Sequence, residues 1–326
     1  MTTALSKIIL DTDPGGDDIF ALLWLLSLVR QGLADLLAIT TTGGNVVAPR
    51  TFASASQVLD LVGFSAIEIG RGVEPSTGDR ADASHIHGND GMGNLSASLP
   101  APSQQFERAR YSDEILIDRL QTHPGEITLV AIGPLSNLAA AEAKRPGILR
   151  LAREIVVMGG AFFTPGNVAP QGEFNIWFNP EAAATVLHSR RDIVMLPLDV
   201  TRQLIFTPAM AQAIGQPQPE SRLAQFLSNL TDFMVATSLS YRETLGQTGF
   251  LVHDAATLGY LFYPELFWFQ RAQVRVETQG WSLGQTAIDR RPLAKTDANA
   301  WVALGVEKTL FFTHLVQDLQ YLVGHL

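Results

Sequence analysis

Four aspartates lie close together near the amino terminus, at Asp11, Asp13, Asp17 and Asp18. Carboxylates at such short spacing repel one another, because a like charge nearby disfavours ionisation by about one to three pKa units. A bound cation would remove this repulsion. The segment contains neither a thiol nor an imidazole, and its hard oxygen ligands suit calcium or magnesium better than zinc or copper. The spacing therefore predicts a metal site.

The acidic segment lies between two apolar stretches that predict how it is held. Residues 8–10 are typical of a buried strand and residues 19–29 of a helix, so the aspartates fall where a strand ends. Ligands of open α/β sheets collect at that end. The proline and two glycines that follow Asp13 allow a sharp turn, which would bring Asp13 and Asp18 round the same point.

A second interpretation gives Asp17 and Asp18 a smaller part. Acidic residues in the first turn of a helix complement the positive end of its dipole, an effect worth about 0.3 to 1 kcal/mol. This interpretation does not explain Asp11 and Asp13, which precede the helix. A metal explains all of them, so we expect a cation at this loop.

The composition excludes several other classes of protein. With 326 residues, of which 46% are hydrophobic, the chain is long enough for a large core in one α/β domain or two. Its net charge of −9 and the lack of any Lys/Arg run argue against a surface that binds the phosphate backbone of nucleic acids. The absence of cysteine excludes disulfides, thiolate zinc sites and cysteine nucleophiles.

The start of the chain and its longest apolar run bear on location. Residues 1–7 lack the basic region, the long apolar region and the cleavage site of a signal peptide. Residues 19–26 form the longest apolar run, far short of the roughly twenty residues that a membrane span needs. We therefore expect a soluble, cytoplasmic protein with neither nucleic acid nor a membrane as a partner.

Strand and helix signals alternate along the chain. Such alternation is typical of an α/β fold with an open, mostly parallel, doubly wound sheet and helices on both faces. We interpret residues 1–326 as one domain, with a small helical insertion or subdomain near 207–250. The predicted strands are 8–10, 36–42, 66–69, 127–132, 155–158 and 192–196, and further strands near 272–277 and 285–288 precede a final helix from about 307.

Polar residues cluster in the loop that follows the predicted strand 155–158. Asn167, Glu173 and Asn175 surround the aromatic Phe174, and amides with a carboxylate suit sugar hydroxyls, which need both donors and acceptors. Single asparagines in loops also commonly bond their own backbone. Because every such motif lies at the carboxyl end of a predicted strand, the pattern favours one shared site.

A long loop is predicted over residues 70–110. Loops of this length in compact domains are usually functional or disordered. Its core, residues 85–93, is too rich in glycine to pack as an element, and a histidine in such a loop is more often solvated than catalytic. The pair His253-Asp254 is also ambiguous, since such a pair is often only an N-cap with a polar neighbour.

The acidic segment, Asp-Thr-Asp-Pro-Gly-Gly-Asp-Asp, resembles the amino-terminal signature of the nucleoside hydrolases, the calcium-dependent N-ribohydrolases of the inosine-uridine-preferring type. The similarity runs from about Lys7 to about Gly259. One departure is Asn179, which stands where we expect aspartate, although either residue caps a helix. The other stretches that resemble the family are His-Gly and Asp-Gly-Met-Gly within 87–93, the turn 133–137, and residues 167–182.

The resemblance implies a function, the hydrolysis of the N-glycosidic bond of ribonucleosides to free base and ribose, as in purine and pyrimidine salvage. It implies Ca²⁺ as the cofactor. Relatives are commonly homodimers or homotetramers, so we expect a homo-oligomer. The implied calcium ligands are Asp13, Asp18, Asp254 and the main-chain carbonyl of Ile132, with Asp11 supporting them.

The resemblance also implies how the substrate is held and cleaved. Asp13 would be the general base for the attacking water, and His253 the acid near the departing base, with an unperturbed pKa of about 6.5 suited to donation at neutral pH. The implied substrate-binding residues are Asp17, Asn175 and Asp254 at the 2′ and 3′ hydroxyls, Asn167 and Glu173 at the 5′ hydroxyl, Asn45 at the 2′ side or the water, His87 at the rim, and Tyr241 beside His253.

Two other functions share part of this pattern. A phosphohydrolase with an aspartate nucleophile also has Asp-x-Asp after its first strand and uses magnesium, but it needs a phosphate-binding lysine and a second acidic pair that we do not find. A non-catalytic nucleoside-binding protein would keep the ribose residues and lose Asp13, Asp18 and Asp254, all of which are present. Release of free ribose from inosine or uridine separates the three functions.

Overall fold

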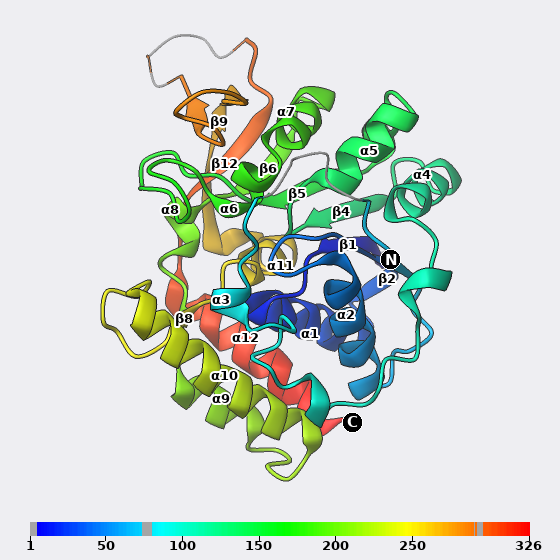
Figure 1. The fold of residues 1–326 in the computed structure, drawn as a ribbon, viewed down its shortest axis with the longest axis vertical. Coiled ribbons are helices and arrows are strands. Elements are labelled where there is room, and N and C mark those ends of the chain that lie inside the picture. The colour runs from blue at the N-terminus through cyan, green and yellow to red at the C-terminus, as the bar shows by residue number, and fades with distance from the viewer. Residues whose placement is uncertain (1–4, 74–79, 290, 292–295) are drawn as a thin grey trace.

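The computed structural model describes residues 5–73, 80–289, 291 and 296–326, so the first four residues and part of the predicted loop 70–110 lie outside the described residues. Its centre is a sheet of eight strands (Figure 1), in which every neighbouring pair is parallel except the last. In their order across the sheet the strands are β3 (Ile69–Gly70), β2 (Ala34–Thr41), β1 (Ser6–Thr12), β4 (Ile127–Ala131), β5 (Glu154–Met158), β6 (Ile193–Leu196), β12 (Ala300–Val306) and β9 (Phe267–Ala272).

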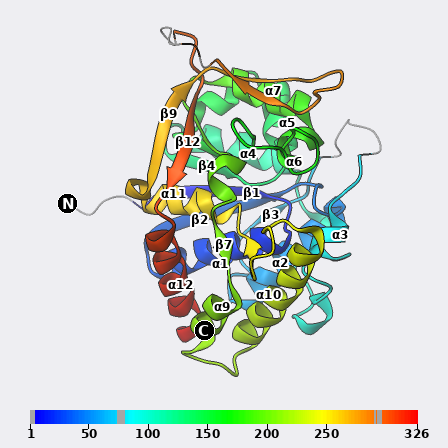
Figure 2. The same ribbon diagram turned by 90° about the vertical axis from the view of Figure 1, so that its left-hand side faces the viewer.

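Both faces of the sheet are covered by helices. Alternate residues of β1 point to opposite faces, so Ile8 and Leu10 join one apolar cluster and Ile9 joins the other. The predicted doubly wound α/β fold is therefore confirmed. Figures 1 and 2 show α1 (Gly16–Arg30), α2 (Ala48–Leu61) and α12 (Lys308–Gly324) on one side of the sheet, and α4 (Ser112–Thr122), α5 (Ser136–Lys144) and α7 (Pro180–Ser189) on the other.

Helix α1 is buried on all sides. Every residue from Gly16 to Leu28 is buried, in agreement with the continuous apolar pattern of this segment. The helix packs against α12 and α11 (Ala255–Phe262), and the indole nitrogen of Trp24 donates a hydrogen bond of 2.7 Å to Asp318 of α12. A helix held in this way presents the aspartates of its first turn at a fixed place.

The sequence patterns predict neither β12 nor β9. The predicted strand 272–277 instead corresponds mainly to the short strand β10 (Val274–Val276), which pairs with β11 (Thr286–Ile288). Strand β12 exposes Trp301 and Leu304, so it lacks the continuous apolar run of a strand that is buried on both faces. Its insertion between β6 and β9 depends on pairing across a long stretch of chain, which no local pattern predicts.

The helices predicted between 207 and 243 are present as α9 (Pro208–Gly215) and α10 (Arg222–Tyr241). That this segment is a subdomain of a single domain stays a prediction. The remaining elements are the short helices α3 (Ser84–His87), α6 (Phe174–Phe178) and α8 (Leu198–Thr201), the paired strands β7 (Ile205–Phe206) and β8 (Phe250–Leu251), and the 3₁₀ turns η1 (Ser96–Ser98), η2 (Phe106–Arg108), η3 (Ile148–Leu151) and η4 (Pro264–Leu266).

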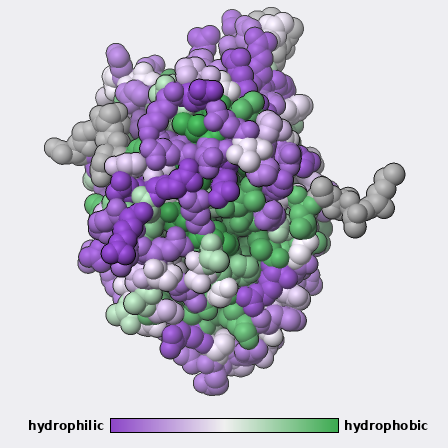
Figure 3. Space-filling model, turned by 90° about the vertical axis from the view of Figure 1, so that its right-hand side faces the viewer, coloured by the Kyte–Doolittle hydropathy of each residue, from purple (hydrophilic) through white to green (hydrophobic). Residues whose placement is uncertain are grey.

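One face of the molecule carries both polar and apolar side chains. Figure 3 shows the side on which α2 and α4 lie, where polar side chains surround a central group of apolar ones. Across the described part of the chain, no helix is both long enough and apolar enough to cross a membrane.

Candidate active site

The carboxyl ends of β1, β2, β4 and β5 open into a cavity of about 470 Å³. Asp17 follows β1, Asn45 follows β2, Ile132 follows β4 and Met158 ends β5, and all of them line the cavity. The structure thus brings together the loops that the sequence analysis assigned to one site. Of the predicted substrate-binding and catalytic residues, the lining also includes His87, Asn167, Glu173, Asn175, Tyr241, His253 and Asp254.

Asp18 is held by the turn that precedes α1. Its Oδ1 accepts a hydrogen bond of 2.6 Å from the Thr12 hydroxyl, and its Oδ2 accepts bonds from Gly15 N at 3.0 Å and from Asn45 Nδ2 at 2.9 Å. The helix-end interpretation therefore holds for this residue. It does not exclude a bound cation, because a carboxylate has about four acceptor positions.

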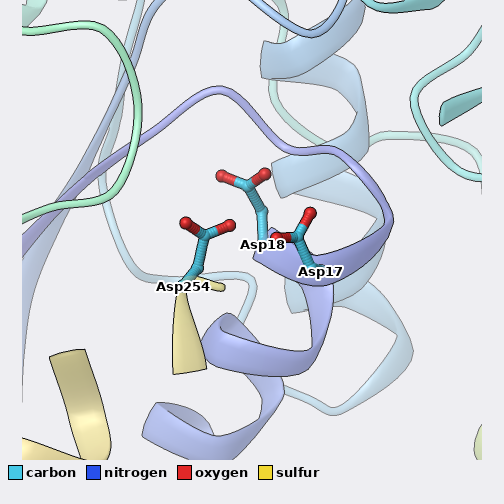
Figure 4. A group of neighbouring side chains, drawn as sticks. All are labelled: Asp17, Asp18 and Asp254. Atoms are coloured by element: carbon cyan, nitrogen blue, oxygen red, sulfur yellow. The ribbon is translucent and has the colours of Figure 1, made fainter. Parts of the chain in front are cut away.

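Three buried carboxylates converge at the cavity, those of Asp17, Asp18 and Asp254. Figure 4 shows the first two at the start of α1 and Asp254 opposite them. One oxygen of each lies within 4.8 Å of the other two, close enough for a single metal ion. Asp254 immediately precedes α11, yet its side chain makes no capping hydrogen bond, so capping does not explain this carboxylate.

Asp13 lies in a tight backbone cradle beside this group. Its Oδ2 accepts a hydrogen bond of 2.7 Å from Asn45 N, whereas its buried Oδ1 has no hydrogen-bond partner among the described residues. A Cβ added to Gly44 would lie 2.1 Å from Oδ2, and one added to Gly133 would lie 2.4 Å from Oδ1. The two glycines therefore give the carboxylate room that no other residue type would leave.

Burial and mutual repulsion disfavour the ionised forms of these acids. Burial and the charge of Asp18 raise the pKa of Asp13 well above its usual value. Burial and the charge of Asp17 do the same to the pKa of Asp254, and burial with the charge of Asp18 raises the pKa of Asp17 to about 8. Burial also raises the pKa of Asp18. The folded chain by itself therefore does not stabilise four negative charges here.

The site fits a hard metal cation. Its side-chain donors are oxygens, one of them is buried without a partner, and an unpartnered buried oxygen calls for an ion or a water molecule. Within the described ranges no lysine or arginine forms an ion pair with any of these four aspartates. A cation would supply the missing positive charge and reverse the pKa shifts. The acidic cluster could thus hold a metal ion.

Asp11 lies beneath the cluster on β1. Its Oδ1 accepts hydrogen bonds from the Thr40 hydroxyl at 2.6 Å and from Asn137 Nδ2 at 2.7 Å, and burial raises its pKa to about 7. Asn137 also donates to the carbonyl of Thr41 at 2.8 Å, so it ties three strand ends together. The turn 133–137 was named for its resemblance to the family, and Asn137 was given no role. An amide in the first turn of the helix that follows a strand is the signal that could have identified it.

The carbonyl of Ile132 is held by Asn175. The Asn175 amide donates hydrogen bonds to Ile132 O at 2.9 Å and to Met158 O at 3.2 Å. This arrangement leaves Asn175 Oδ1 as the polar atom of the side chain available to a ligand, since no hydrogen bond reaches it from the described residues. The predicted contact of Asn175 with ribose and the predicted metal contact of Ile132 O both stay predictions.

Glu173 and Asn167 shape the neighbouring loop. Glu173 caps α6, and its carboxylate accepts hydrogen bonds from the main-chain nitrogens of Asn175 at 2.9 Å, Gly160 at 3.0 Å and Ile176 at 3.2 Å. Asn167 Oδ1 accepts from Phe174 N at 2.9 Å. Both side chains therefore accept hydrogen bonds from the backbone. Their predicted contacts with the 5′ hydroxyl would use the donor or acceptor positions that remain. The predicted helix cap at Asn179 is confirmed, because its Oδ1 accepts from Ala182 N at 3.1 Å.

His87 lies against the acidic turn and not in a solvated loop. It ends the short helix α3, which corrects the prediction that residues 85–93 form no element, and its Nδ1 accepts a hydrogen bond of 2.9 Å from Gly16 N. Burial and the charge of His85 lower the pKa of His87 to about 4. The neutral ring thus helps to fix the first turn of α1. Its side chain is buried and lines the cavity, so it is not a solvated surface histidine, while its predicted contact with substrate stays a prediction.

His253 differs from the sequence prediction in its electrostatics. Burial, followed by the charge of Arg202, lowers its pKa to about 3, so the expected unperturbed value is wrong and the ring is neutral at pH 7 in this structure. Its Nδ1 forms a hydrogen bond of 2.7 Å with the hydroxyl of Thr201 in α8. The sequence analysis did not identify Thr201.

Tyr241 lies at the mouth of the cavity. It is 53% exposed, and its ring meets that of His85 edge to face at 5.3 Å between centroids. Glu243 lines the same part of the cavity, and burial raises its pKa. Neither His85 nor Glu243 was predicted, because their approach to the site depends on tertiary structure. Tyr241, His85 and Glu243 all line the cavity.

The chain matches a family model described as inosine-uridine preferring nucleoside hydrolase over residues 8–313. The chain belongs to this family. The family membership confirms the predicted resemblance and the predicted class of enzyme, a hydrolase that acts on N-glycosyl compounds.

Relatives that are named for their activities align with almost the whole nucleoside hydrolase chain. A pyrimidine-specific ribonucleoside hydrolase, RihA of Shewanella woodyi, is 36% identical over 317 residues, which cover 96% of this chain and 97% of the relative. A probable uridine nucleosidase of Oryza sativa subsp. japonica is 33% identical over 301 residues, 90% of this chain and 88% of the relative. The solved structure of a purine-preferring ribonucleoside hydrolase from Gardnerella vaginalis superposes with a TM-score of 0.88 at 28% identity, covering 98% and 99% of the two chains.

Proposed function

We propose that this nucleoside hydrolase cleaves the N-glycosidic bond of ribonucleosides with the help of one calcium ion. The observation that carries the proposal is the convergence of buried, mutually repelling carboxylates at a nucleoside-sized cavity in a chain of this family. Its relatives are named for both pyrimidine and purine nucleosides, so the proposal covers both classes of base. A homodimer or homotetramer and a cytoplasmic location stay predictions.

Asp13, Asp18, Asp254 and the carbonyl of Ile132 would hold the calcium ion. Asp13 and Asp18 are each 1% exposed and lie below the cavity wall, whereas Asp17 is part of that wall. This difference supports giving the metal to the deeper pair and leaving Asp17 for the substrate. When bound, the ion would neutralise the cluster and lower the pKa of a water molecule.

Asp13 would accept the proton of the attacking water. Its Oδ1 is buried without a hydrogen-bond partner among the described residues, as is Oδ2 of Asp11, and Asn45 N fixes the other oxygen of Asp13 at 2.7 Å. The water oxygen forms the new bond to C1′ as its proton passes to Oδ1. The C1′–N bond breaks at the same time, and its electron pair leaves with the base.

Asp17, Asp254 and Asn175 would grip the ribose. Oxocarbenium character develops on the sugar as the base departs, and carboxylates near the hydroxyls stabilise that positive charge. All three side chains line the cavity, and Asn175 is fixed by two hydrogen bonds to strand ends. Asn167 and Glu173 would hold the 5′ hydroxyl from the opposite loop.

His253 would stabilise the departing base. Because its ring is neutral in this structure, the role that its geometry supports is a hydrogen bond from Nε2–H to the base as negative charge develops there. The base leaves as an anion that this hydrogen bond stabilises, and it takes a proton from bulk water, so the imidazole itself stays neutral.

Formation of free ribose is the experiment that tests this function. The purified protein is incubated with inosine and with uridine, and the free base and the reducing sugar are measured together. We expect both products in equal amounts. A nucleoside-binding protein would release neither, and a phosphohydrolase would act only on a phosphorylated substrate.

A change of leaving group isolates the part played by His253. We expect His253→Ala to lower kcat on inosine and uridine by about 10²-fold, the lower end of what acid catalysis supplies. Cleavage of p-nitrophenyl riboside should stay nearly unchanged, because p-nitrophenolate leaves without help. The comparison requires kcat for both substrates with the variant and the wild type. Equal losses on both would show that His253 holds ribose or structure instead.

A further inference from the structure

Thr201 contacts His253, which lines the cavity and directly precedes Asp254 in the sequence. Its hydroxyl is 2.7 Å from Nδ1 of His253, and its side chain is fully buried. Thr201 ends α8, the short helix that follows the carboxyl end of β6, so it reaches the site from a strand that contributes no other predicted residue. Neither the acidic cluster nor the ribose-binding residues involve it.

The direction of this hydrogen bond follows from what else surrounds Thr201. A hydroxyl has one hydrogen, and a buried donor left without an acceptor is costly. Among the described residues, Nδ1 of His253 is the single hydrogen-bond partner of the Thr201 hydroxyl. The hydroxyl therefore donates, and Nδ1 accepts. A neutral imidazole that accepts at Nδ1 carries its own hydrogen on Nε2.

Helix α8 is anchored on both sides of Thr201. The carboxylate of Asp199 accepts hydrogen bonds from Phe162 N at 2.9 Å and Phe163 N at 2.7 Å. The guanidinium of Arg202 donates to the Thr164 hydroxyl at 2.9 Å and to Gly166 O at 2.8 Å. The loop after β5 thus clamps α8 in place. Such a clamp keeps the Thr201 hydroxyl at one position relative to the histidine.

We propose that Thr201 is a positioning residue that holds His253 as the Nε2–H tautomer, with Nε2 available to the leaving base. The hydroxyl occupies Nδ1, so Nε2 is the ring nitrogen left for a ligand in the cavity that His253 lines. A neutral ring in the other tautomer would present a lone pair to the base and would repel its developing negative charge. The proposal rests on the proposed nucleoside hydrolysis and deepens it.

The kinetic test compares two substitutions of the same residue. Thr201→Val keeps the shape and removes the hydroxyl, and we expect it to lower kcat on uridine by about 10-fold, with little change in KM, since a lost tautomer preference removes part of an effect of about 10². Thr201→Ser keeps the hydroxyl and should stay within about two-fold of the wild type. Cleavage of p-nitrophenyl riboside should be the same for all three proteins.

Two further measurements separate positioning from a structural role. In the His253→Ala background, Thr201→Val should cause no additional loss of kcat on uridine, because the two residues act through one interaction. Thr231→Val is the matched control: Thr231 is also buried, and its hydroxyl donates to Leu227 O at 2.7 Å within α10. We expect wild-type kinetics for this control.

The tautomer itself can be read by ¹⁵N NMR of protein labelled at histidine, with the His253 signals assigned by their loss in His253→Ala. We expect Nε2–H in the wild type and in Thr201→Ser, and a mixture of tautomers in Thr201→Val. Equal slowing of both substrates, additive losses in the double variant, or an unchanged tautomer in Thr201→Val would overturn the proposal. If the wild type itself releases no ribose, the proposed function fails, and the NMR result then decides the tautomer separately.

Discussion

Replacement of Asp13 by asparagine should lower kcat on ribonucleosides by at least about 10³-fold, because it removes the general base together with one predicted metal ligand. The fold should survive. Asparagine has the same shape, and its carbonyl oxygen can still accept the hydrogen bond from Asn45 N. The measurement is kcat on inosine and uridine, with circular dichroism to confirm the fold.

The same variant should be more stable than the wild type when no cation is present. A raised pKa means that the folded chain disfavours the ionised acid, so above the normal pKa of aspartate Asp13 costs stability, and a neutral residue removes that cost. In chelator at pH 7 we expect the unfolding temperature to rise by about 1 to 3 °C. Asp232→Asn, at an exposed helix position, is the control and should change neither quantity. Turnover of Asp13→Asn within ten-fold of the wild type would remove Asp13 from the mechanism.

Loss of the 2′ hydroxyl from the substrate should slow cleavage nearly as much as the Asp13→Asn substitution does. Asp17 and Asn175 line the cavity with acceptors that a deoxyribose would leave buried and unpaired. Sites built to hydrogen-bond a hydroxyl reject the analogue without it by about 10⁴-fold or more. We expect kcat/KM for 2′-deoxyuridine to be lower than that for uridine by about 10³-fold at least, because water can relieve part of the loss.

Uridine and 2′-deoxyuridine differ only in this hydroxyl, so the comparison is free of base effects. The 5′-deoxy analogue serves as a second control, because in the proposed binding mode its missing group would lie near Asn167 and not near Asp17. Its kcat/KM should fall by a smaller factor. Equal rates on uridine and 2′-deoxyuridine would show that the ribose-binding roles given to Asp17 and Asn175 are wrong.

The part of the site that could be predicted depends on local pattern and sheet geometry. The apolar strand before Asp11 and the buried helix after Asp18 are both evident from short stretches of sequence, and the structure has both. Parallel strands gather their carboxyl ends at one edge, so loops distant in sequence could be assigned to one site. Asn45 and Asn175 meet the acidic turn for this reason, whereas Asp254 follows β8 of a separate two-stranded sheet.

The part that could not be predicted depends on three-dimensional surroundings. The pKa of His253 falls because the folded chain removes water from the ring and places Arg202 near it, and neither effect has a local signal. Glu173 carries a carboxylate suited to sugar, yet the fold satisfies it with backbone from two segments. The pairing of β12 with β6 and the hydrogen bond of Thr201 are also tertiary.

The cavity geometry also bears on which aspartates would bind the metal and which would bind the substrate. The resemblance assigns Asp17 to the substrate, and the structure places one of its carboxylate oxygens within 4.8 Å of oxygens of Asp18 and Asp254, so Asp17 could share a metal ion with them. Because the Asp17 side chain also lines the cavity, a ribose hydroxyl and the metal would lie side by side in the proposed complex. One cluster would then bind the cation and orient the sugar together.

Calcium-dependent cleavage can be tested by titrating Ca²⁺ into metal-depleted protein, with ribose release from uridine and inosine as the readout. We expect no release after strong chelation, recovery as Ca²⁺ is added, and saturation near one ion per chain, with base and ribose formed in equal amounts. Undiminished release after thorough chelation would contradict the metal site. The absence of ribose at saturating Ca²⁺ with both nucleosides would contradict the proposed reaction itself.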